Sequence, residues 1–131
     1  MLAVPAAASP PPPEFAGTLD AASLQRLHEL DPQGTNRVVE RVLRAFEASL
    51  LRLLPQSVQA LRDGDHEAVR HVAHTLKSSS ASVGALELSR RCADIENRVR
   101  TQQHDGLAER VDALQAEGQR VLEAVRGLLP G

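Results

Sequence analysis

The sequence predicts an all-α protein, and three of its features support that fold class. Apolar residues recur at helical spacing from about residue 20 onward, and no stretch shows sustained strand alternation. The hydrophobic fraction is 42% but aromatic residues make up only 2%, which suits helix packing better than a β-sandwich. Glycines at 34, 64, 84 and 106 divide the pattern into lengths of roughly 20 to 30 residues, which argues against one long coiled coil.

Six helical segments are expected, with approximate bounds 20–30, 35–54, 56–62, 65–83, 85–102 and 106–129. The first begins at Asp20, a suitable N-cap, and ends before the turn residues Pro32 and Gly34. The second carries a long apolar stripe up to Pro55. Because proline has no backbone donor and is well tolerated only in the first turn of a helix, we expect a kink or a new segment there.

The last three segments each have one apolar face. The fourth has Asp65 as N-cap and Gly84 as its stop signal. The fifth places Leu88, Cys92, Ile95 and Val99 on one face, and the sixth has a similar stripe with Gly118 in one core position. Three pairs of opposite charge in the fifth segment have i, i+4 spacing and are interpreted as helix-surface pairs: Glu87/Arg91, Asp94/Arg98 and Glu96/Arg100.

Long amphipathic helices joined by short connections pack antiparallel, so the predicted architecture is an antiparallel up-down four-helix bundle with a short additional N-terminal helix. The length of 131 residues suits one domain, which we assign to residues 18–131. Residues 1–17 are rich in proline and alanine and are expected to form a disordered tail or linker. The residues chosen to test the expected core are Phe46, Leu76, Leu88, Ile95 and Val111.

Composition also limits the function. The net charge of −2 and the scarcity of aromatic residues give no indication of nucleic-acid binding. No apolar segment approaches the ~20 residues needed to span a membrane, and the N-terminus lacks the basic region of a secretion signal. The single cysteine, Cys92, fits a reducing compartment and is expected to be buried. We therefore expect a cytoplasmic, monomeric protein.

One histidine has an unusual helical neighbourhood. On the segment 65–83, the apolar stripe faces the core and His74 points to solvent. Its neighbours on the outer face are basic or small: Arg70, His71, Lys77, Ser78 and Ala81. An exposed imidazole is largely neutral at cytoplasmic pH, so one ring nitrogen has a lone pair for a phosphoryl group or a metal. The remaining histidines, His28, His66 and His104, are expected to be ordinary surface residues.

The string from His74 to Ser80, followed by Gly84 and Ala85, resembles the signature of histidine-containing phosphotransfer (HPt) domains of bacterial phosphorelays. The resemblance covers about residues 18–102, and Ser78 stands where the family most often has glycine. It implies that His74 is the phosphoacceptor and that Lys77 stabilises charge on the phosphoryl group. The expected docking surface consists of Arg70, His71, Ser78, Ala81, Gly84 and Ala85.

The resemblance also implies the partners, which would be receiver domains of a hybrid sensor histidine kinase or of a response regulator. We expect this chain to bind no cofactor, and Mg²⁺ to come from the partner's carboxylates because the His74 face has none of its own. The chain shows no Gly-rich nucleotide cradle. It is therefore expected to be a phosphoryl carrier without autokinase activity.

Two alternatives remain open at this stage. Glu67, His71 and His74 have i, i+4 and i+7 spacing and could form part of a metal site, although Arg70 and Lys77 oppose cation binding. A non-catalytic helical adaptor that binds a partner through the His74 face is the alternative from a different functional class.

Overall fold

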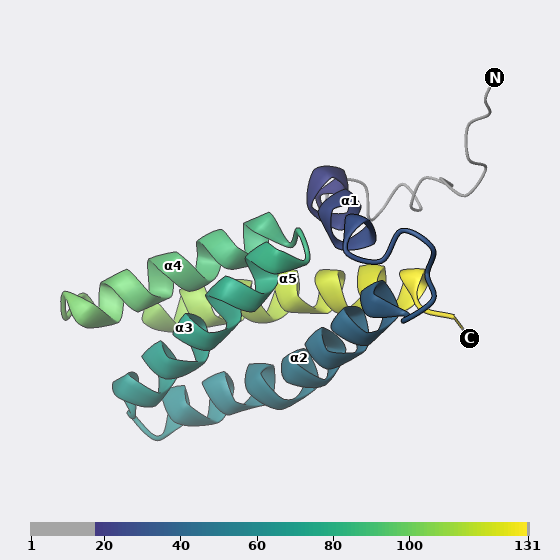
Figure 1. Cartoon of the computed structure of the whole chain (residues 1–131). Helices are drawn as coiled ribbons and strands as arrows, with labels where there is room; N and C mark the ends of the chain where they lie inside the picture. Colours follow the sequence, from purple (N-terminus) through teal and green to yellow (C-terminus); the bar gives the residue numbers. More distant parts are fainter. Residues whose placement is uncertain (1–17, 131) are drawn as a thin grey trace.

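The computed structural model describes residues 18–130, and this part of the chain contains five helices and no strand (Figure 1). The predicted all-α fold class is therefore confirmed. The predicted tail, residues 1–17, lies outside the described residues. The helices are α1 (Ala21–Glu29), α2 (Val38–Arg62), α3 (His66–Ser82), α4 (Leu86–Arg100) and α5 (Leu107–Leu128).

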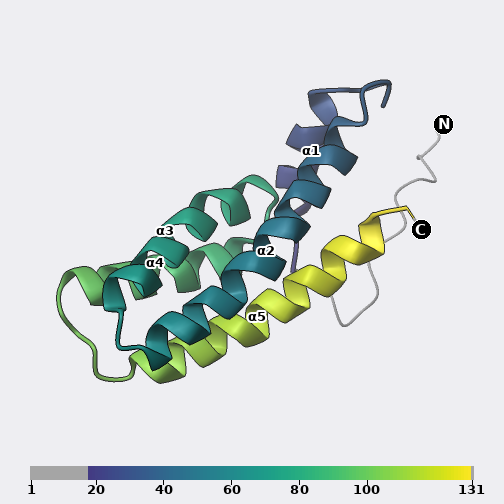
Figure 2. The same cartoon turned by 90° about the horizontal axis from the view of Figure 1, so that it is seen from below.

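Helices α2 to α5 form a closed ring in which each packs against two others. The contacting pairs are α2 with α3, α3 with α4, α4 with α5, and α5 with α2. Short loops connect the consecutive helices of this ring, which run antiparallel, and α1 lies at one end of the bundle beside the start of α2 (Figures 1 and 2). All five residues chosen to test the core are at most 3% exposed, as predicted: Phe46, Leu76, Leu88, Ile95 and Val111.

The predicted break at Pro55 is absent, because α2 continues through this residue to Arg62. The stripe of buried side chains extends on both sides of the proline, so packing favours one continuous helix over two short ones. The backbone carbonyl of the preceding residue, Leu54, accepts from the Ser57 hydroxyl (2.7 Å) and from the Gln115 amide (3.1 Å). The six predicted segments are therefore five helices.

The start of α2 lies slightly later than predicted. The carboxylate of Asp31 accepts from the backbone N–H groups of Asn36 (2.8 Å) and Val38 (3.3 Å), and thereby orders the loop before the helix. Arg37 precedes the first helical residue with a φ of 53°. Because Asp31 satisfies these donors in a non-helical conformation, the helix begins at Val38 and not at residue 35 or 36.

The turn between α3 and α4 is fixed by the start of α1. Gly84 has a φ of +84°, and its carbonyl accepts from the backbone N–H of Asp20 over 2.8 Å. A Cβ atom at Gly84 would lie 2.8 Å from that nitrogen, so glycine is required both for the backbone conformation and for the close approach. The start of α1 thus covers the turn that follows α3, the helix that contains His74.

The core contains a few residues that are not large and apolar. Cys92 is fully buried as predicted, and burial raises the pKa of its thiol to about 12, which keeps it in the unreactive protonated form. Gly118 lets α5 approach the side chain of Leu54 on α2, since a Cβ atom at this position would lie 2.5 Å from Leu54 Cδ1. Within residues 18–130, no helix has the length and apolar character needed to cross a membrane.

Candidate functional site

His74 lies at the middle of α3 and its side chain is 60% exposed. On the opposite face of α3, Val69, Val72, Ala73, Leu76 and Ser80 are buried against the bundle. The helix therefore places the imidazole on the outer surface, as its apolar periodicity predicts.

A carboxylate from the neighbouring helix contacts this imidazole. Oε2 of Glu96 on α4 lies 2.7 Å from Nδ1 of His74, and Oε1 of the same residue accepts from Nζ of Lys77 over 2.6 Å. The Glu96 side chain is only 10% exposed, so its carboxylate lies deeper in the protein than the imidazole and the ammonium group that it contacts. One buried carboxylate thus bridges the two residues of α3 that the sequence assigns to the site.

The electrostatics of Glu96 determine which nitrogen of His74 carries the proton. The hydrogen bond from Lys77 lowers the pKa of Glu96, and the contact with His74 lowers it further, while burial acts in the opposite direction. The side chain is therefore an ionised carboxylate at neutral pH and can only accept hydrogen bonds. Nδ1 of a neutral His74 must then carry the proton, and the lone pair is left on Nε2.

Two cationic groups accompany Glu96 on the α3 side. Besides Lys77, Nη1 of Arg70 lies 3.9 Å from Glu96 Oε2, and the same guanidinium group forms hydrogen bonds with Glu67 on its own helix. The side chains of Arg70 and Lys77 are 33% and 38% exposed, so both reach solvent beside His74. An anion that approached the imidazole would meet these two positive charges.

Glu96 is a residue of this site that the sequence did not predict. Its interpretation as a surface partner of Arg100 is wrong, because Glu96 is buried and Arg100 instead donates to the side chain of Asn97. The expectation that the His74 face has no carboxylate is also wrong, because Glu96 of α4 contacts the imidazole. One signal was present: Glu96 follows Cys92 by four residues, so it lies at the edge of the apolar stripe of α4.

The six expected docking residues divide into two groups. Arg70, His71, Ser78 and Ala81 are at least partly exposed on the outer face of α3. Gly84 and Ala85 are buried, so the expectation that they contribute to the exposed docking surface is wrong. The start of α1 covers Gly84, and Ala85 belongs to the hydrophobic core.

The possible metal site is not assembled in the structure. Across residues 18–130, no group of three or more histidine, cysteine, aspartate or glutamate side chains is arranged to hold a metal ion. The carboxylate of Glu67, one of the three candidate ligands, is hydrogen-bonded to Arg70.

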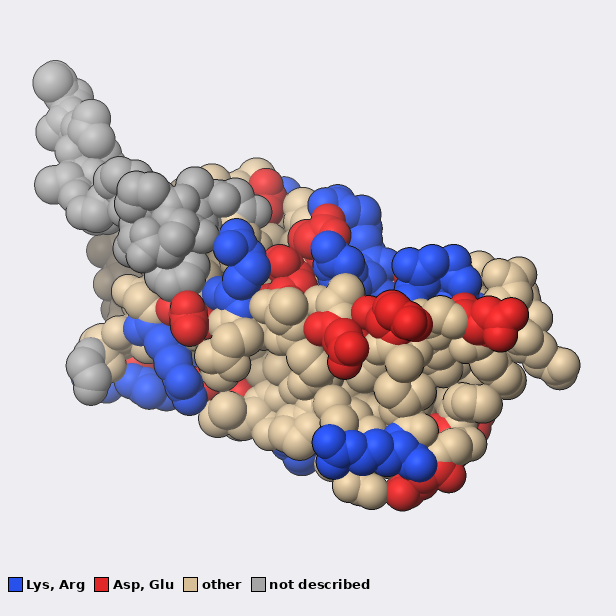
Figure 3. Space-filling model, turned by 180° about the vertical axis from the view of Figure 1, so that it is seen from behind, with Lys and Arg blue, Asp and Glu red and all other residues tan. Residues whose placement is uncertain are grey.

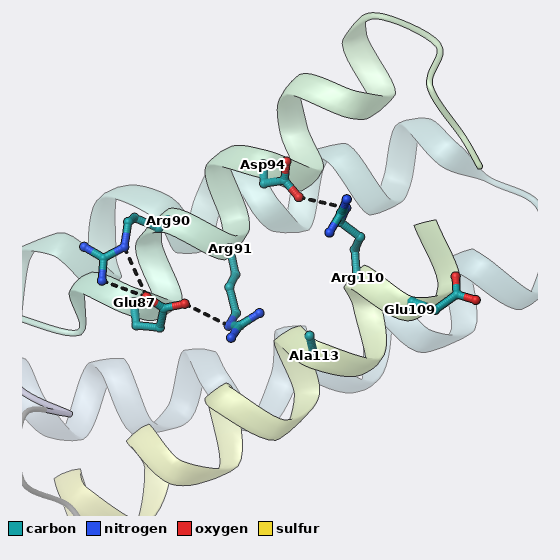
Figure 4. Close-up of a pocket in the computed structure, with 7 residues that line it drawn as sticks. All are labelled: Glu87, Arg90, Arg91, Asp94, Glu109, Arg110 and Ala113. Atoms are coloured by element: carbon teal, nitrogen blue, oxygen red, sulfur yellow. Dashed lines mark hydrogen bonds and ion pairs between the residues drawn. The ribbon is translucent and has the colours of Figure 1, made fainter. Parts of the chain in front are cut away.

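The structure contains a second polar feature, a groove of about 270 Å³ between α4 and α5 (Figure 4). Ion pairs line it: Glu87 pairs with Arg90 and Arg91, and Asp94 pairs with Arg110 across the two helices. On the face opposite to that of Figure 1, basic and acidic groups are interspersed, with no extended field of one sign (Figure 3). The groove does not include His74, and of its ion pairs the one between Asp94 and Arg110 joins α4 to α5.

Comparisons with known proteins identify the family to which the chain belongs. A family model described as the Hpt domain matches residues 41–125, which is more than half of the chain. The crystal structure of histidine-containing phosphotransfer protein B (HptB) from Pseudomonas aeruginosa PAO1 matches with a TM-score of 0.76 and 25% sequence identity. That match covers 86% of this chain and 94% of the other. A search of curated protein sequences produced no significant match.

The chain therefore belongs to the Hpt domain family, and its role is phosphotransfer in phosphorelays. Members of this family are phosphocarriers and not kinases that phosphorylate themselves.

Proposed function

We propose that this protein is a phosphorelay intermediate that accepts a phosphoryl group on Nε2 of His74 from the aspartate of one receiver domain and passes it to another. The observation that carries the proposal is the contact between His74 Nδ1 and Glu96 Oε2 at 2.7 Å on an imidazole that is 60% exposed. This contact holds the ring by one nitrogen and leaves the other free for an incoming group.

The chemistry requires little from this chain besides positioning. The lone pair of Nε2 attacks the phosphorus in line with the aspartyl oxygen, the N–P bond forms, and the P–O bond breaks to release the receiver's aspartate as a carboxylate. Because the proton stays on Nδ1, the phosphorylated ring carries a positive charge beside the phosphoryl group. The adjacent Glu96 carboxylate stabilises that charge, and the same steps in reverse return the phosphoryl group to a receiver.

Charge on the transferring group would be offset from two sides. On this chain, Lys77 lies three residues from His74, and its ammonium group is partly exposed beside the ring. Mg²⁺ bound by the receiver's carboxylates would supply the remaining neutralisation. Glu96 does not replace those ligands, because it is a single carboxylate that already accepts from His74 and Lys77.

The receiver would dock on the outer face of α3. Ser78 and Ala81 follow His74 by four and seven residues and present small side chains, which leave room for a partner surface. Arg70 and His71 lie one turn before His74 on the same side of the helix. The cytoplasmic location and the monomeric state expected from the sequence remain predictions.

The proposal is tested by incubating the protein with a panel of phosphorylated receiver domains and scoring transfer as acid-labile, base-stable phosphate. His74→Gln should abolish uptake and leave the melting temperature close to that of the wild type, since the position is exposed and the glutamine amide can still donate a hydrogen bond to Glu96. His71→Gln is the matched control and should still accept phosphate. Phosphate on both variants would refute the assignment, and a wild-type protein that binds receivers without taking phosphate would be an adaptor.

A further inference from the structure

Three side-chain hydrogen bonds connect α3 to α4 in the described chain, and all three end at the His74 site. Two of them are the contacts of Glu96 with His74 and Lys77. The third comes from Ser89 of α4, whose hydroxyl donates to the backbone carbonyl of Lys77 over 2.9 Å. Lys77 is thus bonded to α4 through both its main chain and its ammonium group.

The bond made by Ser89 differs from those of the other hydroxyl groups. Between residues 18 and 130, the other serine and threonine side chains that donate to a backbone carbonyl all bond within their own helix or its last turn: Ser57, Ser79, Ser82 and Thr101. Such local bonds do not orient one helix relative to another. Among the hydroxyl groups of residues 18–130, only that of Ser89 donates to a backbone carbonyl of another helix, whereas the Ser57 hydroxyl accepts from Gln115 of α5.

The hydrogen bond of Ser89 restricts the position of α4 along the axis of α3. The buried contact between the two helices is formed mainly by apolar side chains such as Leu76, Leu88 and Ile95, and apolar burial has no preferred direction. A hydrogen bond has a defined length and angle. Ser89 and Glu96 are seven residues apart, about 10 Å along the axis of α4 and on the same face. The position of the hydroxyl therefore constrains the position of the carboxylate.

We propose that Ser89 is a positioning residue for phosphotransfer, whose hydroxyl fixes α4 along α3 so that the Glu96 carboxylate stays within hydrogen-bond distance of His74 Nδ1. This inference rests on the proposed function of His74. Without the Ser89 bond, the carboxylate would sample positions farther from the ring, and Nδ1 would keep its proton for a smaller part of the time.

The test combines a spectroscopic and a kinetic measurement on Ser89→Ala. The ¹⁵N chemical shifts of the His74 ring report which nitrogen carries the proton, and they should move toward the Nε2-protonated form in this variant. Transfer from a phosphorylated receiver should slow by about three- to ten-fold, the scale of one neutral hydrogen bond. Ser79→Ala, which removes a hydroxyl that bonds only within α3, is the control and should change neither quantity.

A double-mutant cycle separates positioning from a purely structural role. If Ser89 acts through the carboxylate, Ser89→Ala should slow transfer by less than about two-fold when Glu96→Ala is already present. Equal effects in both backgrounds, or unchanged ring shifts in Ser89→Ala, would overturn the inference. If the wild type takes no phosphate on His74, the proposed function fails, whereas the ring shifts still test the positioning role in the unphosphorylated protein.

Discussion

The carboxylate of Glu96 has both oxygens engaged, one by the His74 ring and one by the Lys77 ammonium. A charged group with so little exposure is stable only where its partners replace the lost water. Here the two partners are the imidazole of His74, the proposed phosphoacceptor, and Lys77, which is expected to contact the phosphoryl group. The arrangement that keeps Glu96 ionised is therefore the same one that leaves Nε2 of His74 available.

Glu96→Gln should lower the rate of receiver-mediated transfer by roughly ten-fold, because the amide cannot stabilise the positive charge that the ring gains on phosphorylation. The measurement is the transfer rate from a phosphorylated receiver at neutral pH. Glu87→Gln is the matched control, since Glu87 lies on the same helix and pairs with Arg90 and Arg91, away from His74. Similar rates for the two variants would show that the charge of Glu96 is not used.

Lys77→Ala should slow transfer or shorten the lifetime of the phosphohistidine by about ten-fold, the scale expected for the loss of one charged hydrogen bond. Two effects act in this direction: the phosphoryl group loses a nearby cation, and the pKa of Glu96 rises because its main hydrogen-bond donor is removed. Rates and lifetimes should be compared with those of Arg41→Ala, a change in an exposed cation at the start of α2. Wild-type kinetics in Lys77→Ala would make Lys77 an ordinary surface residue.

At the scale of the helices, α5 contains a buried acidic residue whose charged form lowers the stability of the bundle. Glu117 is 8% exposed, and its nearest ionic partner, Arg120, is 3.6 Å away. Burial raises the pKa of Glu117, and the nearby Arg120 only partly offsets this effect. The folded protein therefore binds a proton at this residue more readily than the unfolded chain does. The resulting contribution to stability is favourable at low pH and is lost as pH rises through the raised pKa.

Glu117→Gln should increase the free energy of unfolding near pH 7.5, well above the pKa of a carboxyl group in an unfolded chain, because burial disfavours the charged form of the wild-type side chain. The gain should shrink near pH 4, about the pKa of a carboxyl group in an unfolded chain, because the wild-type side chain is then largely protonated in the folded state. Chemical denaturation at both pH values measures the difference. Glu123→Gln, at an exposed position of α5, is the control. An equal gain at both pH values would show that charge burial is not its source.

The contrast between Pro55 and Gly84 also belongs to this scale. Both residues were expected to interrupt a helix, and only the glycine does so. At Pro55, buried side chains on both sides stabilise a single helix despite the missing donor. At Gly84, the chain adopts a positive φ and contacts the backbone of Asp20, which ends α3 and brings α1 onto the turn. A residue that disfavours a helix therefore ends it only where tertiary contacts also favour an end at that position.

At the scale of the whole molecule, the bundle presents the outer face of α3 as a continuous surface with His74 at its middle. Ala81 lies seven residues from His74, about 10 Å along the axis, so it cannot contact the phosphoryl group but would lie beneath a partner that covers the histidine. A substitution at Ala81 therefore tests whether the partner docks on a surface around His74 or whether the imidazole reacts without such a surface.

Ala81→Arg should weaken receiver-mediated transfer strongly, because a bulky charged side chain within an interface disrupts shape complementarity. Phosphate uptake from a small donor such as phosphoramidate needs no docking surface and should be unchanged, and the variant should remain folded. Ala116→Arg places the same side chain on an exposed position of α5, which packs mainly against α2 and α4, and should behave as the wild type. Normal receiver-mediated transfer in Ala81→Arg would place the docking surface elsewhere.

The sequence by itself determined the helical bundle, the buried stripes and the exposure of His74, because each of these depends on residues close together in the chain. A period of 3.6 residues assigns every side chain of one helix to a face, so Leu76 faces inward and His74 outward whatever the rest of the fold. The basic and small neighbours of His74 followed from the same geometry.

Only the tertiary structure decided which carboxylate meets that histidine. Glu96 is 22 residues from His74, and the contact depends on how α4 lies along α3, which no local period specifies. The burial of Gly84 likewise depends on the start of α1, more than 50 residues earlier in the chain. Side-chain periodicity is a property of one helix, whereas the relative position of two helices is set by packing and by a few directional bonds between them.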